Sequence, residues 1–439
     1  MKPVVIAVTL SASLLLASLL FAGLLLAGCS GGDAPPPSVT APAASVPTDV
    51  AAPSRVVEWA LPATLPGSAL PDLTVAPDGS LLLAWTNSQP GRRHLLQFSR
   101  YDPALARWMH APTTIAVGNS MFVNWADTPH ITATADGALW VHWLQKSADA
   151  PYAYDVVVAT SRNGGARWST PIMPHDDGTQ TEHGFVSLWP QSRDALGIAW
   201  LDGRNTGGGE HDSHVGGGAM TLRTATIGAD LRLTGGRELD AMVCDCCQTS
   251  VAMTARGPLL VYRGRTPAEI RDILATRRDG DAWTTPARVH ADDWTMPACP
   301  VNGPSVAAEG EAAVVGWYTA PDNVPEVRLA RSDDAGDRFG APVVLDRGET
   351  VQGRVAVAIG AGQVWASWLR ETDAGQSLWL SRRSADLTIE HERIELAKLQ
   401  GRGRGTGFPQ LVLHDGIAYV VWTDVVSATP QLRAVRVER

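Results

Sequence analysis

The stretch PHITATADGALWVHW, residues 129–143, decides the fold of this chain. It reads as a short apolar strand, a turn centred on Asp-Gly, and a second hydrophobic strand that ends in an aromatic residue. The aromatics that close successive phrases are 51 to 62 residues apart. The shortest spacing is from Trp317 to Trp368, and the longest is from Trp200 to Tyr262. The phrase occurs seven times, at residues 71–85, 129–143, 186–200, 249–262, 304–317, 354–368 and 409–422.

This phrase predicts the blades of a β-propeller. Repeats of this length, made of short strands and glycine-rich turns, are typical of propeller blades because one blade cannot bury its faces without neighbours. We therefore expect an all-β, seven-bladed β-propeller, with six blades as the alternative if one repeat is irregular. After the last phrase, residues 423–439 contain one further strand-like segment, PQLRAVRVER at residues 430–439, so we expect the last blade to lack its outer strand. We expect residues 55–65, RVVEWALPATL, to supply that strand, to close the ring and to remove the free sheet edges.

The N-terminus carries an export signal. Lys2 precedes an apolar run over residues 4–26, and residues 26–30 read LAGCS. This ending resembles the lipobox of bacterial lipoproteins, which implies cleavage before Cys29 and a lipid on that cysteine. By resemblance to Gram-negative sorting signals, Ser30 implies the outer membrane of the cell envelope, with the periplasmic or surface side left open. An uncleaved membrane helix is the alternative, because the run is long enough to span a bilayer.

Composition divides the rest of the chain into a tether and one domain. Residues 31–53 are rich in Pro, Ala, Ser and Thr, and such a stretch extends by roughly 3 Å per residue where it is polyproline-like. A length of 439 residues often indicates more than one domain, but a propeller grows by repetition within one. We assign residues 1–28 to the signal peptide, 29–53 to the lipidated cysteine and a disordered tether, and 54–439 to the propeller domain.

Charge and motifs restrict the partners. A formal net charge of −9 offers no basic surface, which argues against nucleic acid as a partner. The remaining partners are the membrane, through the lipid anchor, and a glycan, small-molecule or protein ligand. No glycine-rich phosphate loop lies between a strand and a helix, so the sequence indicates no nucleotide or flavin cofactor.

A second pattern lies between the third and fourth strands of several blades. Residues 161–168 read SRNGGARW, residues 332–339 read SDDAGDRF, residues 276–283 read TRRDGDAW, and each segment is followed three residues later by a proline. The pattern resembles the Asp-box, or BNR repeat, of sialidase-like propellers, Ser-x-Asp-x-Gly-x-x-Trp. A short acceptor side chain pins the turn, glycine supplies a positive φ, and the aromatic packs beneath. The resemblance implies a propeller of sialidase-like type, with these turns on the face away from the active site.

The opposite face collects the candidate site residues. The segments that enter the inner strands and the loops that follow the aromatics lie on this common face, and propeller ligand sites are built from such loops. Carboxylates, arginines, histidines and amides are dense in these segments. The candidates are Asp127, Arg204, Arg263 and Arg354 as catalytic residues, and Glu182, His183, His211, His214, Gln248, Arg265 and Asn302 as ligand-binding residues.

The sialidase resemblance implies specific roles for some of these residues. In that family three arginines hold the substrate carboxylate, a Tyr-Glu pair is the nucleophile and an aspartate is the acid/base catalyst. Arg204, Arg263 and Arg354 would form the cluster, and Asp127 would be the acid/base residue. The family's N-terminal Phe/Tyr-Arg-Ile-Pro motif is replaced by GSALPDL at residues 67–73, and the sequence indicates no Tyr-Glu pair. The alternative is that the arginines bridge blades through carboxylates and backbone carbonyls.

Four cysteines open the fourth and fifth phrases, namely Cys244, Cys246, Cys247 and Cys299. Adjacent blades bring these openings together near the central channel. An even number of cysteines in an exported protein indicates two disulfides, with the connectivity open. The alternatives are a thiolate site for Cu or Zn, helped by one of the candidate histidines, and a thiol-disulfide redox centre, because a bridge within Cys-x-Cys-Cys is strained.

These observations lead to three functional hypotheses. The first is a lipid-anchored envelope propeller that binds a ligand or a metal ion at its channel-mouth face. The second is an exo-sialidase or related glycoside hydrolase of the sialidase superfamily. The third is an interaction platform in an envelope assembly.

Overall fold

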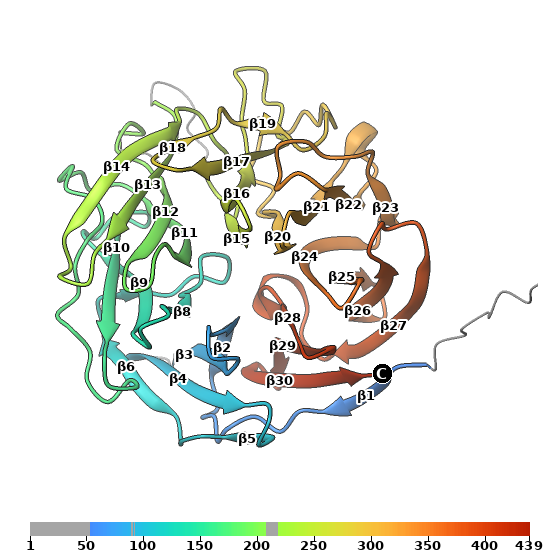
Figure 1. Ribbon diagram of the computed structural model, residues 1–439, viewed down its shortest axis with the longest axis horizontal. Coiled ribbons are helices and arrows are strands. Elements are labelled where there is room, and N and C mark those ends of the chain that lie inside the picture. The colour runs from blue at the N-terminus through green and yellow to red at the C-terminus, as the bar shows by residue number, and fades with distance from the viewer. Residues whose placement is uncertain (1–52, 89–90, 92, 208–217) are drawn as a thin grey trace, which may run out of the picture. The chain divides into compact units, whose positions relative to one another are not determined.

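Seven antiparallel sheets stand around a common axis in the computed structural model, which describes residues 53–88, 91, 93–207 and 218–439 (Figure 1). Each sheet contains four or five strands, and consecutive sheets follow one another around the ring. The prediction of a seven-bladed, all-β propeller is confirmed. None of the helices in the described ranges is long and apolar enough to cross a membrane.

The first three blades take up residues 68–240. Blade 1 contains β2 (Ser68–Val75), β3 (Leu81–Asn87), β4 (His94–Asp102), β5 (Arg107–Trp108) and β6 (Thr113–Gly118). Blade 2 contains β7 (Met121–Phe122), β8 (Ile131–Ala133), β9 (Leu139–Lys146) and β10 (Tyr154–Ser161), with β7 and β8 both paired to β9. Blade 3 contains β11 (His183–Pro190), β12 (Leu196–Asp202), β13 (Thr221–Ile227) and β14 (Leu233–Asp240).

The next three blades follow the same order. Blade 4 contains β15 (Ser250–Thr254), β16 (Gly257–Arg263), β17 (Ile273–Asp279), β18 (Ala282–Trp283) and β19 (Ala287–Arg288). Blade 5 contains β20 (Ser305–Glu309), β21 (Ala312–Thr319), β22 (Glu326–Ser332) and β23 (Val343–Arg347), with the 3₁₀ turn η1 (Pro321–Asn323) after β21. Blade 6 contains β24 (Val351–Gly360), β25 (Gln363–Thr372), β26 (Gly375–Ser384) and β27 (Glu390–Leu399).

Blade 7 combines strands from both ends of the described chain. The 3₁₀ turn η2 (Gly403–Thr406) leads into β28 (Gln410–His414), β29 (Ile417–Val426) and β30 (Thr429–Glu438). The outer strand of this sheet is β1 (Arg55–Glu58), which runs antiparallel to β30 with Arg55 opposite Glu438. Because β1 pairs with β30, the backbone groups on that side of β30 are not left as a free edge.

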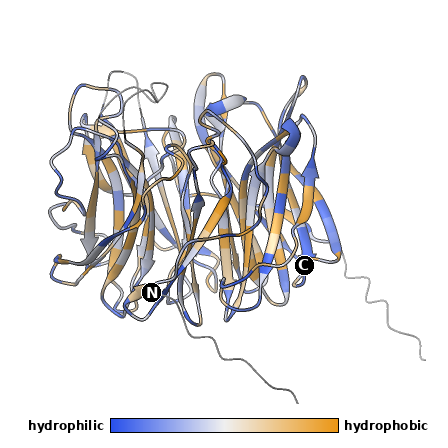
Figure 2. Ribbon diagram, turned by 90° about the horizontal axis from the view of Figure 1, so that it is seen from above, coloured by the Kyte–Doolittle hydropathy of each residue, from blue (hydrophilic) through white to orange (hydrophobic). Residues whose placement is uncertain are grey.

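The core lies between neighbouring blades. The aromatic residue that closes each phrase is at most 6% exposed, in the order Trp85, Trp143, Trp200, Tyr262, Trp317, Trp368 and Trp422. One apolar cluster joins Leu83 of blade 1 to Tyr419 of blade 7, and another joins Phe98 of blade 1 to Val141 of blade 2. Burying an aromatic ring of this size stabilises the fold by roughly 2–3 kcal/mol. Figure 2, a side view, shows the apolar residues concentrated in the strands.

Two turns, one after β10 and one after β22, share one hydrogen-bond pattern. The Ser161 hydroxyl donates to Asn163 Oδ1 (3.0 Å) and accepts from the Gly165 amide (2.9 Å). Ser332 makes the same contacts with Asp334 and Gly336, at 2.8 Å each. The segment at residues 276–283 differs, because Thr276 donates to the Thr284 carbonyl at 2.7 Å.

Glycine is required in these two turns for two reasons. The φ of Gly165 is +89°, and a Cβ there would lie 2.2 Å from Phe98 Cζ. Gly336 has the same φ, and its Cβ would lie 2.4 Å from Leu259 Cδ1. Each turn therefore sits directly on the core of the preceding blade.

Candidate functional site

The segments that enter the inner strands are linked to one another around one end of the channel. Gln248, before β15, donates to the Ala126 carbonyl (2.6 Å) and accepts from the Gly303 amide (2.9 Å). It thereby connects the entrances of blades 2, 4 and 5. Asn302, before β20, donates to the Gln352 carbonyl (3.2 Å) and accepts from the Arg354 amide (2.8 Å). Both candidate amides therefore bind backbone groups of neighbouring blades.

Arg354 continues this ring to blade 7 and back to blade 2. Its guanidinium donates to the carbonyls of Gly407 and Gly403, both at 2.9 Å, and to Thr406 Oγ1 at 2.8 Å. The same group lies 5.0 Å from the ring centre of Trp125, a separation that favours a cation–π interaction. Burial lowers the pKa of Arg354 to about 10.

The other two candidate catalytic arginines also bind groups of the protein itself. Arg263, 1% exposed, donates to the carbonyls of Asn302 (2.8 Å), Arg271 (2.6 Å) and Tyr318 (2.6 Å). Arg204 clamps Asp202 through two hydrogen bonds, of 2.7 Å from Nε and 2.8 Å from Nη2. These are the contacts expected of arginines that bridge loops, and the substrate-binding role of the cluster stays a prediction.

A tyrosine–glutamate pair lies between blades 2 and 3. The Tyr154 hydroxyl, on β10, donates to the carboxylate of Glu182, just before β11. Tyr154 stacks on Phe122, with ring centres 4.1 Å apart. The pair was missed in the sequence because its members lie 28 residues apart on different blades. Tyr and Glu become neighbours only when β10 and the entrance to β11 meet.

Asp127 is buried beside this pair. Its Oδ2 accepts from the Phe185 amide at 2.9 Å, whereas Oδ1 has no hydrogen-bond partner within the described ranges. Burial, with the negative charge of Glu182 as a further cause, raises the pKa of Asp127 to about 8, although the Phe185 hydrogen bond acts in the opposite direction. At neutral pH Asp127 is therefore mostly a protonated acid, which is the state that a general acid requires.

The cysteines opening the fourth phrase form a compact group of sulfurs. The Sγ atoms of Cys244, Cys246 and Cys247 all lie within 4.8 Å of one another, and those of Cys244 and Cys247 are 3.1 Å apart. All three side chains are buried. Cys299, half-buried, packs against the same cluster and contacts Cys246. The four cysteines are free thiols in this structure, and the expected disulfides stay a prediction.

Two buried arginines face this group. Arg271 has a fully buried side chain and donates from Nη2 to Glu269 at 2.7 Å. Its Nε and Nη1 find no hydrogen-bond acceptor in the part of the chain that the structure describes. Burial raises the pKa of Cys244, but hydrogen bonds from Cys246 and Cys247 and the charges of Arg271 and Arg263 together hold it well below its ordinary value.

The net pKa shifts of Cys246 and Cys247 are opposite in direction to that of Cys244. Burial and the hydrogen bond to Cys244 raise the pKa of Cys246 well above its ordinary value, and they raise that of Cys247 as well. The pKa of Cys244 is therefore shifted in the opposite direction from those of its two neighbours, which makes it the cysteine of the three that loses its proton most readily. Arg265, which is also a candidate, pairs with Glu269 at 2.7 Å and with Asp245 at 3.2 Å.

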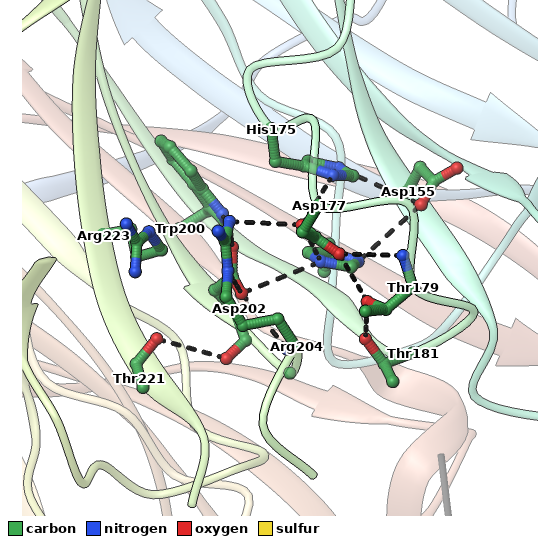
Figure 3. Close-up of polar contacts among 12 residues, drawn as sticks. Asp155, His175, Asp177, Thr179, Thr181, Trp200, Asp202, Arg204, Thr221 and Arg223 are labelled. Atoms are coloured by element: carbon green, nitrogen blue, oxygen red, sulfur yellow. Dashed lines mark hydrogen bonds and ion pairs between the residues drawn. The ribbon is translucent and has the colours of Figure 1, made fainter. Parts of the chain in front are cut away.

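His183 belongs to a separate group of polar side chains at the junction of blades 2 and 3. Its neighbours include Asp155, His175, Asp177 and Asp202. Figure 3 shows other members of this group, among them Asp155, His175 and Asp177. The sequence analysis did not select Asp155, His175 or Asp177. A signal was present, because residues 174–183, PHDDGTQTEH, carry two histidines and an acidic pair in one loop. The candidates Cys29, His211 and His214 lie outside the described residues.

Comparison with known proteins adds support for the fold. No family model and no curated protein matches the chain. Among solved structures, the polysaccharide lyase Uly1 is similar, with 7% identity over 87% of this chain and 92% of that one and a TM-score of 0.52. The α-L-arabinofuranosidase Arb93A from Fusarium graminearum has 12% identity over 87% and 97%, with a TM-score of 0.47. The Hadza microbial sialidase Hz136 has 16% identity over 69% and 63%, with a TM-score of 0.38. At 7% identity the likeness to Uly1 is one of fold alone.

Proposed function

We propose that this protein is a lipid-anchored propeller of the bacterial outer membrane that binds a soft metal ion, Cu(I) or Zn²⁺, through Cys244, Cys246 and Cys247. The observation that carries the proposal is the convergence of three buried sulfurs within 4.8 Å, faced by two buried arginines. Thiolate is the ligand that Cu(I) and Zn²⁺ prefer. Cys299 lies at the edge of the cluster, where it would serve as a fourth ligand for Zn²⁺.

Charge balance supports this assignment. Three thiolates around Cu(I) carry a net charge of −2, and Arg263 and Arg271 together supply +2. A buried guanidinium is costly without an opposing charge. Glu269 pairs with Arg271 Nη2, whereas Nε and Nη1 have no hydrogen-bond acceptor among the described residues, and the charge of Cys244 acts on the same guanidinium. A metal–thiolate centre would offset the charge of these arginines more fully than protonated thiols.

The full-length protein, extracted in detergent from a bacterial envelope, tests the proposal by mass spectrometry. We expect a bound ion in the native mass and its loss on denaturation. After denaturation four thiols are expected to react with an alkylating reagent, whereas the lipidated Cys29 does not react. Cys247→Ser is expected to remove the thiolate-bound ion from the native mass, and Cys299→Ser, at the half-buried edge, to weaken its binding. A denatured mass short of the hydrogens of two disulfides, with no ion, would show a structural role instead.

A second function is favoured by the Tyr154–Glu182 contact. A Tyr-Glu nucleophile with a protonated aspartate nearby is the combination that the sialidase resemblance implies, and Asp127 has the raised pKa of an acid catalyst. We infer glycoside hydrolysis as the alternative function. All three side chains are buried, so a substrate would need the covering loops to open.

A panel of fluorogenic sialosides and arabinofuranosides tests this alternative. We expect hydrolysis by the native protein and at least 100-fold slower hydrolysis by Tyr154→Phe, which removes only the hydroxyl. Arg277→Lys, on the opposite side of blade 4 and bound to Asp337, is the control and is expected to retain the native rate. If the native protein hydrolyses no substrate of the panel, glycoside hydrolysis is excluded as the alternative function.

A further inference from the structure

The loop from β10 to β11 brings two buried histidines against a carboxylate of the neighbouring strand. Asp155 is the second residue of β10, His175 and Asp177 lie in the connecting loop, and His183 is the first residue of β11. The His175 and His183 rings stack almost parallel, with centres 3.9 Å apart and an angle of 4° between their planes. Figure 3 shows Asp155, His175 and Asp177 grouped together.

Three ligand atoms converge in this group. Asp155 Oδ1 lies 3.7 Å from His183 Nδ1 and 4.0 Å from His175 Nε2, and the three atoms are within 4.8 Å of one another. These distances are too long for hydrogen bonds. Neither ring nitrogen has another hydrogen-bond partner in residues 53–88, 91, 93–207 and 218–439. Leaving such buried nitrogens unpaired costs about 1–3 kcal/mol each.

The opposite sides of both rings are held by one carboxylate. Asp177 Oδ2 lies 3.1 Å from His183 Nε2 and 3.5 Å from His175 Nδ1. Asp177 is itself fixed by the Thr179 amide at 3.0 Å and by Arg204 Nη2 at 3.1 Å. A carboxylate that binds one imidazole nitrogen turns the lone pair of the other nitrogen toward a metal ion. Here both free nitrogens face Asp155.

We propose that Asp155, His175 and His183 form a second metal site, for a divalent transition ion of the Zn²⁺ class, with Asp177 as the outer carboxylate that orients both histidines. Two imidazole nitrogens and one carboxylate oxygen are a common ligand set for such ions. Bonds of about 2.1 Å in a tetrahedral site place ligand atoms roughly 3.4 Å apart. The observed 3.7 and 4.0 Å require a contraction of a few tenths of an ångström, together with a rotation of the parallel rings that turns both lone pairs toward the ion.

The ion belongs on the Asp155 side of the rings and not on the other. Asp177, His183 and Asp202 also form a close group, with His183 Nε2 at 3.8 Å from Asp202 Oδ1. That side already contains the Arg204 guanidinium, which pairs with both carboxylates at 2.7 and 3.1 Å. A second cation there would be repelled. The Asp155 side chain is 20% exposed, so a fourth coordination position would open toward solvent, as in sites that keep a bound water.

This site is independent of the cysteine cluster, and the experiment separates the two. The full-length protein is stripped with a chelator under reducing conditions and titrated with Co²⁺, whose spectrum reports its ligands, and then with Zn²⁺ by calorimetry. In Cys247→Ser, which lacks the thiolate site, we expect one equivalent of Co²⁺ with visible d–d bands and no thiolate charge-transfer band. The native protein is expected to bind the same equivalent in addition to the thiolate-bound ion. The equivalent at Asp155 is expected to resist Ca²⁺ and Mg²⁺, which prefer oxygen ligands.

Variants of the site give the decisive comparison. Asp155→Asn and His175→Asn are expected to lose this equivalent, and Asp177→Asn is expected to weaken its affinity by 10–100-fold without changing the stoichiometry. His391→Asn, on the exposed surface of β27, is the control and is expected to bind as the native protein does. Asp155→Asn keeps the size of a partly exposed side chain, so it tests the site even if the buried histidine variant fails to fold. Native stoichiometry in Asp155→Asn, or loss of the equivalent in Cys247→Ser, would overturn the proposal.

Discussion

The protonated state of Asp127 makes a prediction about stability that can be worked out in sign and size. Burial raises the pKa of this carboxyl from 3.8 to about 8 in the folded protein. In the unfolded chain the carboxyl loses its proton above about pH 4, whereas the folded protein retains it to about pH 8. The stability that this group contributes is therefore fully present below pH 4 and is lost as the pH rises toward 8.

The magnitude follows from the shift. Each pKa unit corresponds to about 1.4 kcal/mol, so the interval between pH 4.5 and pH 7.5 accounts for about 4 kcal/mol. Asp127→Asn keeps the acceptor for the Phe185 amide and has no proton to release, so it lacks this dependence. We expect the unfolding free energy of the native protein, minus that of Asp127→Asn, to fall by about 4 kcal/mol over this interval.

Urea unfolding followed by tryptophan fluorescence at pH 4.5, 6 and 7.5 measures this difference. Asp136→Asn is a control with an almost constant difference: desolvation acts to raise the pKa of Asp136, but hydrogen bonds from Thr134 and Ala138 and pairing with Arg162 lower it below 3.8, so this carboxyl is ionised in the folded and the unfolded protein at all three pH values. The stabilisation contributed by Asp136 is lost as the pH falls through its lowered pKa. A difference between native protein and Asp127→Asn that stays constant, or grows, from pH 4.5 to 7.5 would refute the protonated state of Asp127.

Three further substitutions test the packing. Gly165→Ala is expected to destabilise the fold by at least 2 kcal/mol more than Gly164→Ala in thermal unfolding, because both have positive φ but only the Gly165 Cβ meets Phe98; equal losses would show that the turn does not sit on the ring. Gln248→Ala, which leaves the Ala126 carbonyl and the Gly303 amide unpaired, is expected to cost about 1–3 kcal/mol in urea unfolding, and an unchanged midpoint would contradict the inter-blade link. Trp368→Ala, at a fully buried closing aromatic, is expected to cost about 3–5 kcal/mol in the same assay, whereas a loss below 1 kcal/mol would argue against an inter-blade core at this position.

The blades could be predicted from the sequence because each repeats the same local chemistry. A phrase such as residues 129–143 contains its own strand pair and turn, and the register of β8 and β9 depends only on residues within it. Trp143 and its counterparts are buried for the same local reason in every blade. The period of the repeat is therefore sufficient to predict the propeller fold.

The sites could be predicted only in part, because their residues meet across blades. The cysteines were recognised from their identity, but no spacing in the sequence indicates that the charge of the buried Arg271 acts on Cys244. Asp155 and His183 come from different blades, and no spacing in the chain indicates that their side chains meet. The sequence also does not show whether the N–H groups of Arg263 are free to bind a ligand. In the structure they donate to three backbone carbonyls from other parts of the chain.

The most direct test of the proposed function is the X-ray absorption fine structure of the copper or zinc that the purified full-length Asp155→Asn variant, which lacks the second site, retains after excess ion is removed. A site built from Cys244, Cys246 and Cys247 predicts a shell of three sulfur atoms, or four with Cys299 around zinc, at about 2.3 Å from the metal. A shell of nitrogen and oxygen alone, or a protein without a stoichiometric ion, would contradict it.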